Sequence, residues 1–443
     1  MVPARSRRRR ASRMEEHVKK IKVAHVTTVA QSLQGLLLNQ MNNIQSKGYE
    51  VVGISSPGGE IPMIEAAGIR HFAIRISRNV TPLLDLVSLM RLYLVMRQEG
   101  FTIVHTHTPK AGLLGQLAAR FAGVPIVINT VHGFYCHDLM HPILRRFYIG
   151  FEKVAARCSD VILAQNQEDV EMALSMGICS PEKVKHLGNG IDLSLFNREQ
   201  VMTGDIHRKR HQLGIPDDAK VVGFVGRLAG KRKGFFDFLK ACQGVAGQYQ
   251  NVRFLIIGES DTGKADAVSP GAAKDYGVSD QCMFLGARPN EELPSFYALM
   301  DVLVLPSLFE GIPRVVMEAA AMGVPAVVTD VKGNREAVMH GRNGLLVPLG
   351  NPQALAEAII ELLTNPEKAM CMGEEAYRMA REQFDERVVF AKVINEYSRL
   401  LADKDLRVPV SNATATELAH ASSNGRPTYA RRLSTPSREN RPW

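Results

Sequence analysis

Two glutamates, Glu310 and Glu318, stand eight residues apart where the sequence changes from a strand pattern to a helix pattern. Val302–Leu305 is short, apolar and rich in β-branched residues, which is typical of a buried parallel strand. A helical pattern then runs from Arg314 into Ala321. The first glutamate is therefore expected on the loop, and the second about one and a half turns into the helix.

The loop between this strand and this helix has the composition of an anion-binding turn. It carries Gly311, Ile312 and Pro313, and proline suits the first helical position because its missing N–H would not have been bonded there. Backbone N–H groups and the positive end of the helix dipole would then point at one place, which favours a phosphate. Carboxylates beside such a place suit uncharged groups, and sugar or ribose hydroxyls are the obvious candidates.

Two cations follow another expected strand, Val221–Gly226, on a short loop. Arg227 comes directly after this strand, and Lys233 precedes the next helix. The loop can bring both to the cleft edge that holds Glu310, where fixed cations would suit a diphosphate leaving group without a divalent metal. The alternative is a solvated basic loop.

Histidines end two further expected strands. His105, His107 and Lys110 lie in the string IVHTHTPKAG, and His132 ends the next strand, just before Gly133. The first two histidines share one face of an extended chain, but no further ligand stands at supporting spacing, so we predict no metal site. We expect these three residues to line the acceptor side of a cleft. The stronger functional candidate is His132, because it lies at a strand's carboxyl end.

Strands that alternate with helices position these residues. The alternation runs from Ile21 to about residue 192 and restarts at Val221, which predicts an α/β chain with two doubly wound, Rossmann-like domains facing across a cleft. We place the domains at 21–192 and 218–383, an interdomain connection at 193–217, a helix at 384–401, and disordered tails at 1–20 and 402–443.

Composition narrows the class of protein. The chain has 443 residues, is 45% apolar and 22% charged, and its cysteines are scattered singly, which favours a globular protein of a reducing compartment. No apolar run is long enough to span a membrane, and the arginine-rich start lacks the apolar segment of a signal peptide, so we expect a cytoplasmic location.

The net charge of +9 belongs to the two tails. Residues 1–20 carry a net +6 and residues 402–443 a net +3, so the body between them is close to neutral. We therefore expect no nucleic-acid partner. The first tail is able to attract the anionic inner face of the cytoplasmic membrane, with a merely solvated tail as the alternative. Neither a G-x-G-x-x-G string after the first strand nor a P-loop is present, which disfavours dinucleotide and P-loop enzymes.

Together these motifs resemble the retaining glycosyltransferases of family 4, which have the two-domain GT-B fold. The resemblance covers about residues 21–400. Its most specific part is the E-x7-E motif of Glu310 and Glu318 within LPSLFEGIPRVVMEAAAMGVPAVVTD, supported by the GRL…KG loop, the NGID turn and the RNGLLVP segment. The first half looks like the subgroup that builds bacterial lipid-linked oligosaccharides and exopolysaccharides.

The resemblance implies a role for each site residue. Arg227 and Lys233 would hold the donor diphosphate, Glu310 the hydroxyls of the donor sugar, and Glu318 the ribose. The N–H groups around Gly311 and Ile312 would meet sugar or phosphate, and His132 would lie near the transferred sugar. One departure is that the loop after the first strand has only Gly35, where many members have a glycine pair.

The implied reaction moves a hexose or N-acetylhexosamine from a nucleotide sugar, above all a UDP-sugar, to a saccharide or polyprenyl-diphosphate-linked acceptor. It needs no cofactor and retains the anomeric configuration. The helix at 384–401 would cross back to the first domain. Two alternatives stay open at this point: a UDP-sugar 2-epimerase of the same architecture, and a non-enzymatic binding protein that associates with membranes through its tails.

Overall fold

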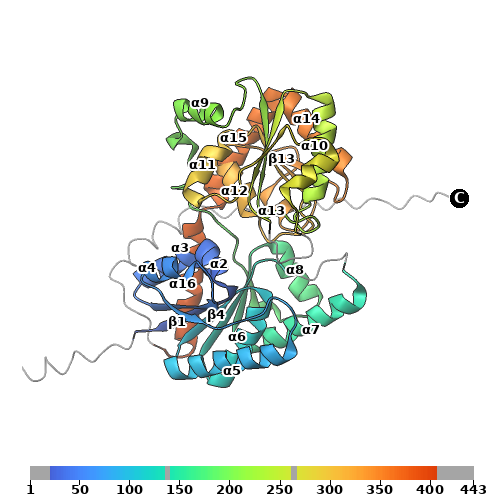
Figure 1. The fold of residues 1–443 in the computed structure, drawn as a ribbon. Coiled ribbons are helices and arrows are strands. Elements are labelled where there is room, and N and C mark those ends of the chain that lie inside the picture. Colours follow the sequence, from blue (N-terminus) through green and yellow to red (C-terminus); the bar gives the residue numbers. More distant parts are fainter. Residues whose placement is uncertain (1–19, 135–139, 261–266, 407–443) are drawn as a thin grey trace, which may run out of the picture.

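The computed structural model describes residues 20–134, 140–260 and 267–406, which form two lobes (Figure 1). Each lobe contains one parallel sheet with helices on both faces. The expected pair of doubly wound lobes is therefore confirmed. The central strands of each sheet are almost wholly buried, as they must be when helices cover both faces, whereas the edge strands Arg70–Ala73 and Cys282–Phe284 contain no buried residue.

The sheet of the first lobe has the strand order β3-β2-β1-β4-β5-β6-β7. Its strands are β1 (Lys22–Val29), β2 (Glu50–Ser56), β3 (Arg70–Ala73), β4 (Ile103–Thr106), β5 (Ile126–Val131), β6 (Val161–Ala164) and β7 (Val184–His186). The order reverses between β1 and β4, so the carboxyl ends of these two strands flank the crevice where doubly wound sheets bind ligands.

Helices cover the first sheet in two layers. They are α2 (Ala30–Ser32), α3 (Leu38–Ser46), α4 (Ile61–Ala66), α5 (Pro82–Glu99), α6 (Pro109–Ala122), α7 (Pro142–Cys158) and α8 (Gln167–Ser175), with a π-helical turn at Leu33–Leu37. Helix α6 packs between α5 and α7 on one face (Figure 1). The π-helical turn and α3 pack on the opposite face.

The second lobe repeats this architecture with the strand order β10-β9-β8-β11-β12-β13. Its strands are β8 (Lys220–Val225), β9 (Val252–Ile257), β10 (Cys282–Phe284), β11 (Val302–Leu305), β12 (Ala326–Thr329) and β13 (Gly344–Val347). Its main helices are α10 (Phe235–Gln248), α11 (Leu293–Tyr297), α12 (Arg314–Ala321), α13 (Asn334–Ala337), α14 (Pro352–Thr364) and α15 (Pro366–Gln383). Strands β8 and β11 are neighbours, which brings the loop that follows each of them to one edge.

The segment expected to connect the domains, 193–217, is part of the second lobe. It contains α9 (Thr203–Gln212), and Phe196 and Ile215 are buried in that lobe's core. Sequence periodicity missed this because α9 buries none of its residues and is rich in charge. The actual passage between lobes is the short stretch around Ile191.

The last helix, α16 (Glu386–Asp403), returns to the first lobe, where Val393 and Tyr397 are buried in its core (Figure 1). The helix runs to Asp403, so residues 402 and 403, which were predicted to belong to a disordered tail, are helical. The two passages between the lobes pair with each other: Ile191 N–H donates to Phe384 O at 2.9 Å, and Glu386 N–H donates to Ile191 O at 3.1 Å.

Both predicted tails otherwise lie outside the described residues. Within the described ranges, no helix combines the length and the apolar character needed to cross a bilayer.

Candidate active site

Lys233 and Glu310 form the centre of the candidate site. The Lys233 Nζ donates to Glu310 Oε1 at 2.6 Å, and these side chains are 16% and 10% exposed. Gly234 makes the approach possible, since it has a φ of 64° and a Cβ there would lie 1.9 Å from the Pro306 carbonyl oxygen. A glycine before α10 thus allows the basic loop to lie directly against the end of β11.

The electrostatics keep Glu310 ionised. Burial alone raises the pKa of Glu310, but attraction to and a hydrogen bond from Lys233 outweigh it, with help from Ser307 and Arg232, so the pKa is lowered overall. The pair is therefore a buried carboxylate with its cation, where the loop before α10 meets the loop after β11.

The rest of the basic loop is also partly buried. Arg227 lies at the end of β8 with intermediate exposure. The Arg232 guanidinium lies 5.0 Å from the centroid of the Phe309 ring. The alternative of a merely solvated loop is thus wrong for Lys233 and Arg232, because both side chains contact the loop that carries Glu310.

Glu318 lies deeper, on α12. The Tyr297 hydroxyl donates to its Oε2 at 2.8 Å, and Arg314 Nε stands 3.7 Å from Oε1. Burial raises the pKa of Glu318, and Arg314 and Tyr297 only partly offset this. Arg314 also donates to Gly35 O of the first lobe at 3.4 Å, so it links the acid to the π-helical turn Leu33–Leu37.

The start of α12 is held from across the cleft. The carbonyls of Gly311 and Ile312 accept hydrogen bonds from the Nδ2 atoms of Asn166 (3.2 Å) and Asn189 (3.0 Å) in the first lobe's half of the chain. The C=O and N–H of a trans peptide point in opposite directions, so the Ile312 N–H is directed away from Asn166. Pro313 is the N-cap, not the first helical residue as expected.

Two glycines meet where the lobes touch. A Cβ on Gly133 would lie 3.1 Å from Gly311 Cα, and a Cβ on Gly311 would lie 2.8 Å from the His132 carbonyl oxygen. Ordinary side chains do not fit at these distances, so the glycines permit a backbone-to-backbone approach. The backbone of His132 therefore lies against the loop that carries Glu310.

His132 itself is a neutral imidazole. Its Nε2 lies 3.1 Å from His107 Nδ1, and the Gln165 side chain hydrogen-bonds the ring. Burial lowers the pKa of His132 to about 4, with Gln165 opposing the shift. Near neutral pH the ring thus carries one N–H and one lone pair.

The acceptor-side placement of His105 and His107 is corrected by the structure. Their side chains are 0% and 1% exposed, so they do not line an open cleft. Both sit beneath His132, in contact with His25 on the adjacent strand β1. Sequence reasoning missed His25 because it lies inside an apolar strand, although strand register places it beside His105.

Lys110 has a structural role. Its ammonium forms an ion pair with Asp85 at 2.5 Å and hydrogen-bonds Thr81 Oγ1 at 3.3 Å. It therefore fastens the start of α6 to the start of α5, at the edge of the first lobe.

Ion pairs also join the lobes. Lys332 Nζ lies 2.5 Å from Asp169 Oδ1, and Arg335 contacts Glu168 with two nitrogens. These partners are more than 150 residues apart in sequence, which is why no local pattern revealed them.

Comparison with known proteins decides the family. Residues 205–379 match the model described as glycosyl transferases group 1, and residues 34–195 match the model of glycosyltransferase family 4. A D-inositol 3-phosphate glycosyltransferase of Corynebacterium urealyticum is 40% identical over 293 residues, which are 63% of this chain and 68% of that protein. The chain belongs to glycosyltransferase family 4.

Other relatives of this glycosyltransferase match over longer stretches. The Escherichia coli UDP-Gal:alpha-D-GlcNAc-diphosphoundecaprenol alpha-1,3-galactosyltransferase is 28% identical across 77% of this chain and 88% of its own length. The capsular polysaccharide biosynthesis glycosyltransferase CapM of Staphylococcus aureus is 28% identical across 88% of this chain and its full length.

Among solved structures, Anabaena HepE in complex with UDP-glucose superposes with a TM-score of 0.73, at 21% identity, over 86% of this chain and all of HepE. The sucrose-phosphate synthase of Thermosynechococcus elongatus also has a TM-score of 0.73, at 18% identity, over 87% of this chain and all of that one. The GT-B fold that the sequence implied is thereby confirmed.

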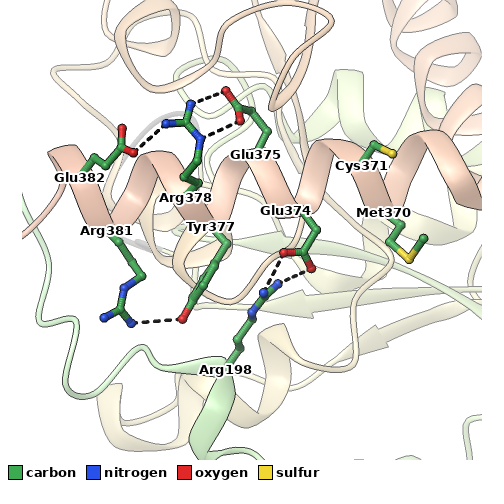
Figure 2. A pocket seen from close by; sticks show the side chains of 9 residues that line it. All are labelled: Arg198, Met370, Cys371, Glu374, Glu375, Tyr377, Arg378, Arg381 and Glu382. Carbon is green, nitrogen blue, oxygen red and sulfur yellow. Dashed lines mark hydrogen bonds and ion pairs between the residues drawn. The ribbon is translucent and has the colours of Figure 1, made fainter. Parts of the chain in front are cut away.

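The glycosyltransferase also has an open groove along α15, away from the Glu310 loop (Figure 2). Its charged residues pair among themselves: Arg198 contacts Glu374 through two nitrogens, and Arg378 bridges Glu375 and Glu382. The charges of this groove are therefore satisfied internally.

Proposed function

We propose that this glycosyltransferase transfers a hexose or N-acetylhexosamine from a UDP-sugar to a saccharide or polyprenyl-diphosphate-linked acceptor, with retention of configuration. The observation that carries the proposal is the contact of Lys233 with Glu310 at the lobe interface, opposite His132. The activity of the Escherichia coli relative and the UDP-glucose bound to HepE support a UDP-sugar donor and a lipid diphosphate acceptor.

Each donor group then has a protein partner. Lys233 and Arg227 bind the diphosphate, and the Ile312 N–H adds a backbone donor at the start of α12. Glu310 accepts hydrogen bonds from the sugar hydroxyls, and the deeper Glu318 accepts from the ribose. His132 contacts the transferred sugar from the first lobe.

The reaction breaks the bond between the sugar C1 and the diphosphate oxygen, and it forms a bond from C1 to the acceptor oxygen on the same face. The acceptor hydroxyl gives its proton to the departing phosphate oxygen. Lys233 and Arg227 stabilise the charge that builds on this oxygen, so the chemistry needs no cofactor. In this scheme Lys233 exchanges part of its contact with Glu310 for the phosphate.

A thermal-shift screen tests the donor class. UDP-glucose, UDP-galactose and UDP-N-acetylglucosamine are compared with GDP-mannose and ADP-glucose. A donor present at 100 times its Kd stabilises the folded protein by about 2.7 kcal/mol, which raises the melting temperature measurably. Stabilisation by GDP- or ADP-sugars, and none by UDP-sugars, would refute the assigned nucleotide.

Product analysis tests the reaction. With an undecaprenyl-diphosphate-linked sugar as acceptor, NMR of the new glycosidic bond should show the anomeric configuration of the donor. An inverted product would refute retention. Release of free UDP without any acceptor product would instead favour the 2-epimerase alternative.

We further propose that the enzyme associates peripherally with an anionic membrane surface through an apolar face on α5 and α7. Helix α5 is apolar nearly all round: it buries Leu92 and Met96, yet Leu83 is 82% exposed. On α7, Ile143 is 74% exposed. The exposed residues of this face are Leu83, Leu84, Leu86, Val87, Met90, Leu94, Ile143, Leu144, Phe147, Phe151 and Val154.

A bilayer fits this face better than protein partners do. Exposed Arg91, Arg146 and Arg157 lie among the apolar residues, and α7 carries four basic residues against one acid. A second copy would bring arginines against arginines, and the chain's own tails are basic. Anionic lipid satisfies both the apolar and the cationic groups.

Vesicle sedimentation tests the face. The double variant Leu86→Glu/Phe147→Glu should bind phosphatidylglycerol vesicles at least about tenfold more weakly than the native chain, since it removes apolar area and adds negative charge. The matched control is Met370→Glu/Val388→Glu, at exposed apolar positions of α15 and α16. Unchanged binding by the first variant, with loss on deletion of residues 1–19, would assign the contact to the tail and refute the face.

A further inference from the structure

A continuous chain of hydrogen bonds runs from the interior of the first lobe to His132. Inside it, His25 Nδ1 lies 3.0 Å from His107 Nε2, and His107 Nδ1 lies 3.1 Å from His132 Nε2. His25 and His107 are no more than 1% exposed, so water does not compete for these nitrogens. These hydrogen bonds therefore connect the rings of His25, His107 and His132 from nitrogen to nitrogen.

The inner end of the chain is on the returning helix α16. The Tyr397 hydroxyl lies 3.4 Å from His25 Nε2 and 2.7 Å from His105 Nδ1. The other nitrogen of His105 lies 2.7 Å from Thr130 Oγ1. Each ring nitrogen of His25, His105 and His107 thus faces one specific partner. We call Tyr397, His25, His105 and His107 the histidine relay.

Proton counting leaves this relay two states. Burial lowers the pKa of His25 to about 3 and lowers those of His105 and His107 well below the usual value, so each ring is neutral with one N–H and one lone pair. Every contact needs one proton, and each ring supplies one. If one ring changes tautomer, all must change. The three relay histidines and His132 therefore carry their protons either all on Nδ1 or all on Nε2.

Gln165 selects between these states at the outer end. Its Oε1 is directed at the lobe interface, 2.9 Å from where a Cβ on Gly311 would stand. Its hydrogen bond favours the protonated form of His132, as expected when the amide oxygen accepts from the ring. With Nε2 facing His107, the nitrogen that donates to Gln165 is Nδ1.

The geometry points to a positioning role for the histidine relay: it fixes His132 as the Nδ1–H tautomer and sets its ring orientation from the returning helix α16. His107 donates to His132 Nε2, so the remaining Nδ1–H donates to the Gln165 amide oxygen, and the ring plane is fixed from both sides. This inference rests on the proposed function for the meaning of that fixed ring, which is to contact the transferred sugar. The relay itself stands on the contacts alone.

A metal site is the competing interpretation, because His25, His105 and His107 place nitrogens within 4.8 Å of one another. A metal ion lies in the plane of each ligand ring, on a free lone pair. Here His105 and His107 stack with centroids 4.4 Å apart at 25°, and their nitrogens already face hydrogen-bond partners. The cluster therefore fits a relay better than a coordination sphere.

Histidine-selective ¹⁵N NMR tests the tautomers without reference to activity. Signals are assigned by replacing each of the four histidines singly with glutamine. All four should show a protonated Nδ1 and an unprotonated Nε2 at pH 7. A mixture of tautomers among them, or four Nε2–H rings, would overturn the inference. A shift of the His25, His105 and His107 signals together on adding one equivalent of Zn²⁺ would overturn it in favour of a metal site.

Kinetics then test the link to the sugar. Tyr397→Phe keeps the ring and removes the hydroxyl that joins the relay; kcat should fall about fivefold, the effect of one lost hydrogen bond, with KM for the donor little changed. The matched control is Tyr49→Phe: this buried tyrosine packs on Tyr397, with ring centroids 5.9 Å apart, but bonds no relay member. It should leave kcat and the tautomers unchanged.

The outcomes separate the two proposals. If no UDP-sugar serves as donor but all four rings are Nδ1–H, the proposed function fails and the relay stands. If transfer proceeds while Tyr397→Phe changes neither the tautomers nor kcat, the relay fails and the function stands. Equal losses in Tyr397→Phe and Tyr49→Phe would reduce the effect to packing and also refute the relay.

Discussion

At the scale of single residues, the ion pair of Lys233 and Glu310 gives the most direct test of the proposed function. Lys233→Met keeps the length of the side chain and removes its charge, so the leaving phosphate loses a cation and Glu310 loses its partner. We expect kcat/KM to fall about 100-fold, as for other losses of one charge-stabilising donor. Steady-state kinetics with UDP-sugar measure this.

Lys231→Met is the matched control, because Lys231 lies on the same loop and is exposed. Its kcat/KM should stay within about threefold of the native value, since an exposed, screened charge contributes little. Equal losses in the two variants would show that the loop acts through its overall charge.

The buried histidines predict a pH dependence of stability. The pKa of His25 falls from 6.5 in the unfolded chain to about 3 in the folded one. Between these values the unfolded chain binds the extra proton, so stability is complete above pH 6.5 and is lost as the pH decreases toward 3. One such group contributes about 1.4 kcal/mol per pH unit across this range.

Urea unfolding at pH 7, 6 and 5 measures the effect. His25→Gln should lower the slope of unfolding free energy against pH by the equivalent of about one proton. His207→Gln, on the helix α9 that buries no residue, should leave it unchanged. An unaltered slope in His25→Gln would mean that this ring is accessible to protons in the folded state.

Sequence patterns identified the residues that belong to local motifs. The spacing of Glu310 and Glu318, and the strand end before Arg227, were readable because each lies within one strand-loop-helix unit. Tyr297 and Gln165 were not readable, since each reaches the site from a separate unit. His105 and His107 were predicted to line a cleft because a strand pattern does not show which strand ends are covered. In the folded lobe both residues are buried.

At the scale of elements, the close approach of two loops limits what can stand between the lobes. Gly311→Ala places a methyl group 2.8 Å from the His132 carbonyl oxygen and 2.9 Å from Gln165 Oε1, so the loops must move apart. We expect kcat/KM to fall at least about tenfold, as for small misplacements of a reacting group. The melting temperature should change little, because neither lobe's core is touched.

Gly247→Ala is its control. A Cβ there meets nothing within 4 Å, and the position is exposed in helix α10, so the variant should be fully active and more stable by about 0.5–1 kcal/mol. Full activity of Gly311→Ala would show that the lobes need not approach so closely during turnover.

Elements with strong periodicity or strand composition were predicted well, and short or charged ones were not. The strands β8, β11 and β12 are mostly apolar runs, so their positions are evident in the sequence to within a residue. Strand β7 was missed because it is three residues long and contains a lysine and a histidine. Helix α9 was read as linker because its charged residues show no apolar face.

At the scale of the whole molecule, the returning helix should hold the lobes together even when the chain is cut. A protease site placed at Asp217–Asp218, which is exposed, divides the chain inside the second lobe. The nicked protein should still elute from a sizing column as one particle, because α16 is buried in the first lobe and the segment before the cut packs on the second.

Combining the nick with Val393→Asp supplies the comparison. That change buries a charge where α16 meets the first lobe, so the fragments of the nicked variant should separate at a lower urea concentration than those of the nicked native chain. Separation of the nicked protein without this change would show that α16 contributes little to the association.

The two chain passages pair at Ile191, and we expect the lobes to rotate about this pairing as an axis. Gly190 lies beside the pairing, and a Cβ there would stand 2.6 Å from Glu386 Cα. Rotation moves each atom in proportion to its distance from the axis. A small rotation at Ile191 therefore produces a large separation between the parts of the lobes that lie farthest from it. Turnover can then be tuned at Gly190, by altering how often the enzyme opens to discharge product, without changing any group that touches sugar.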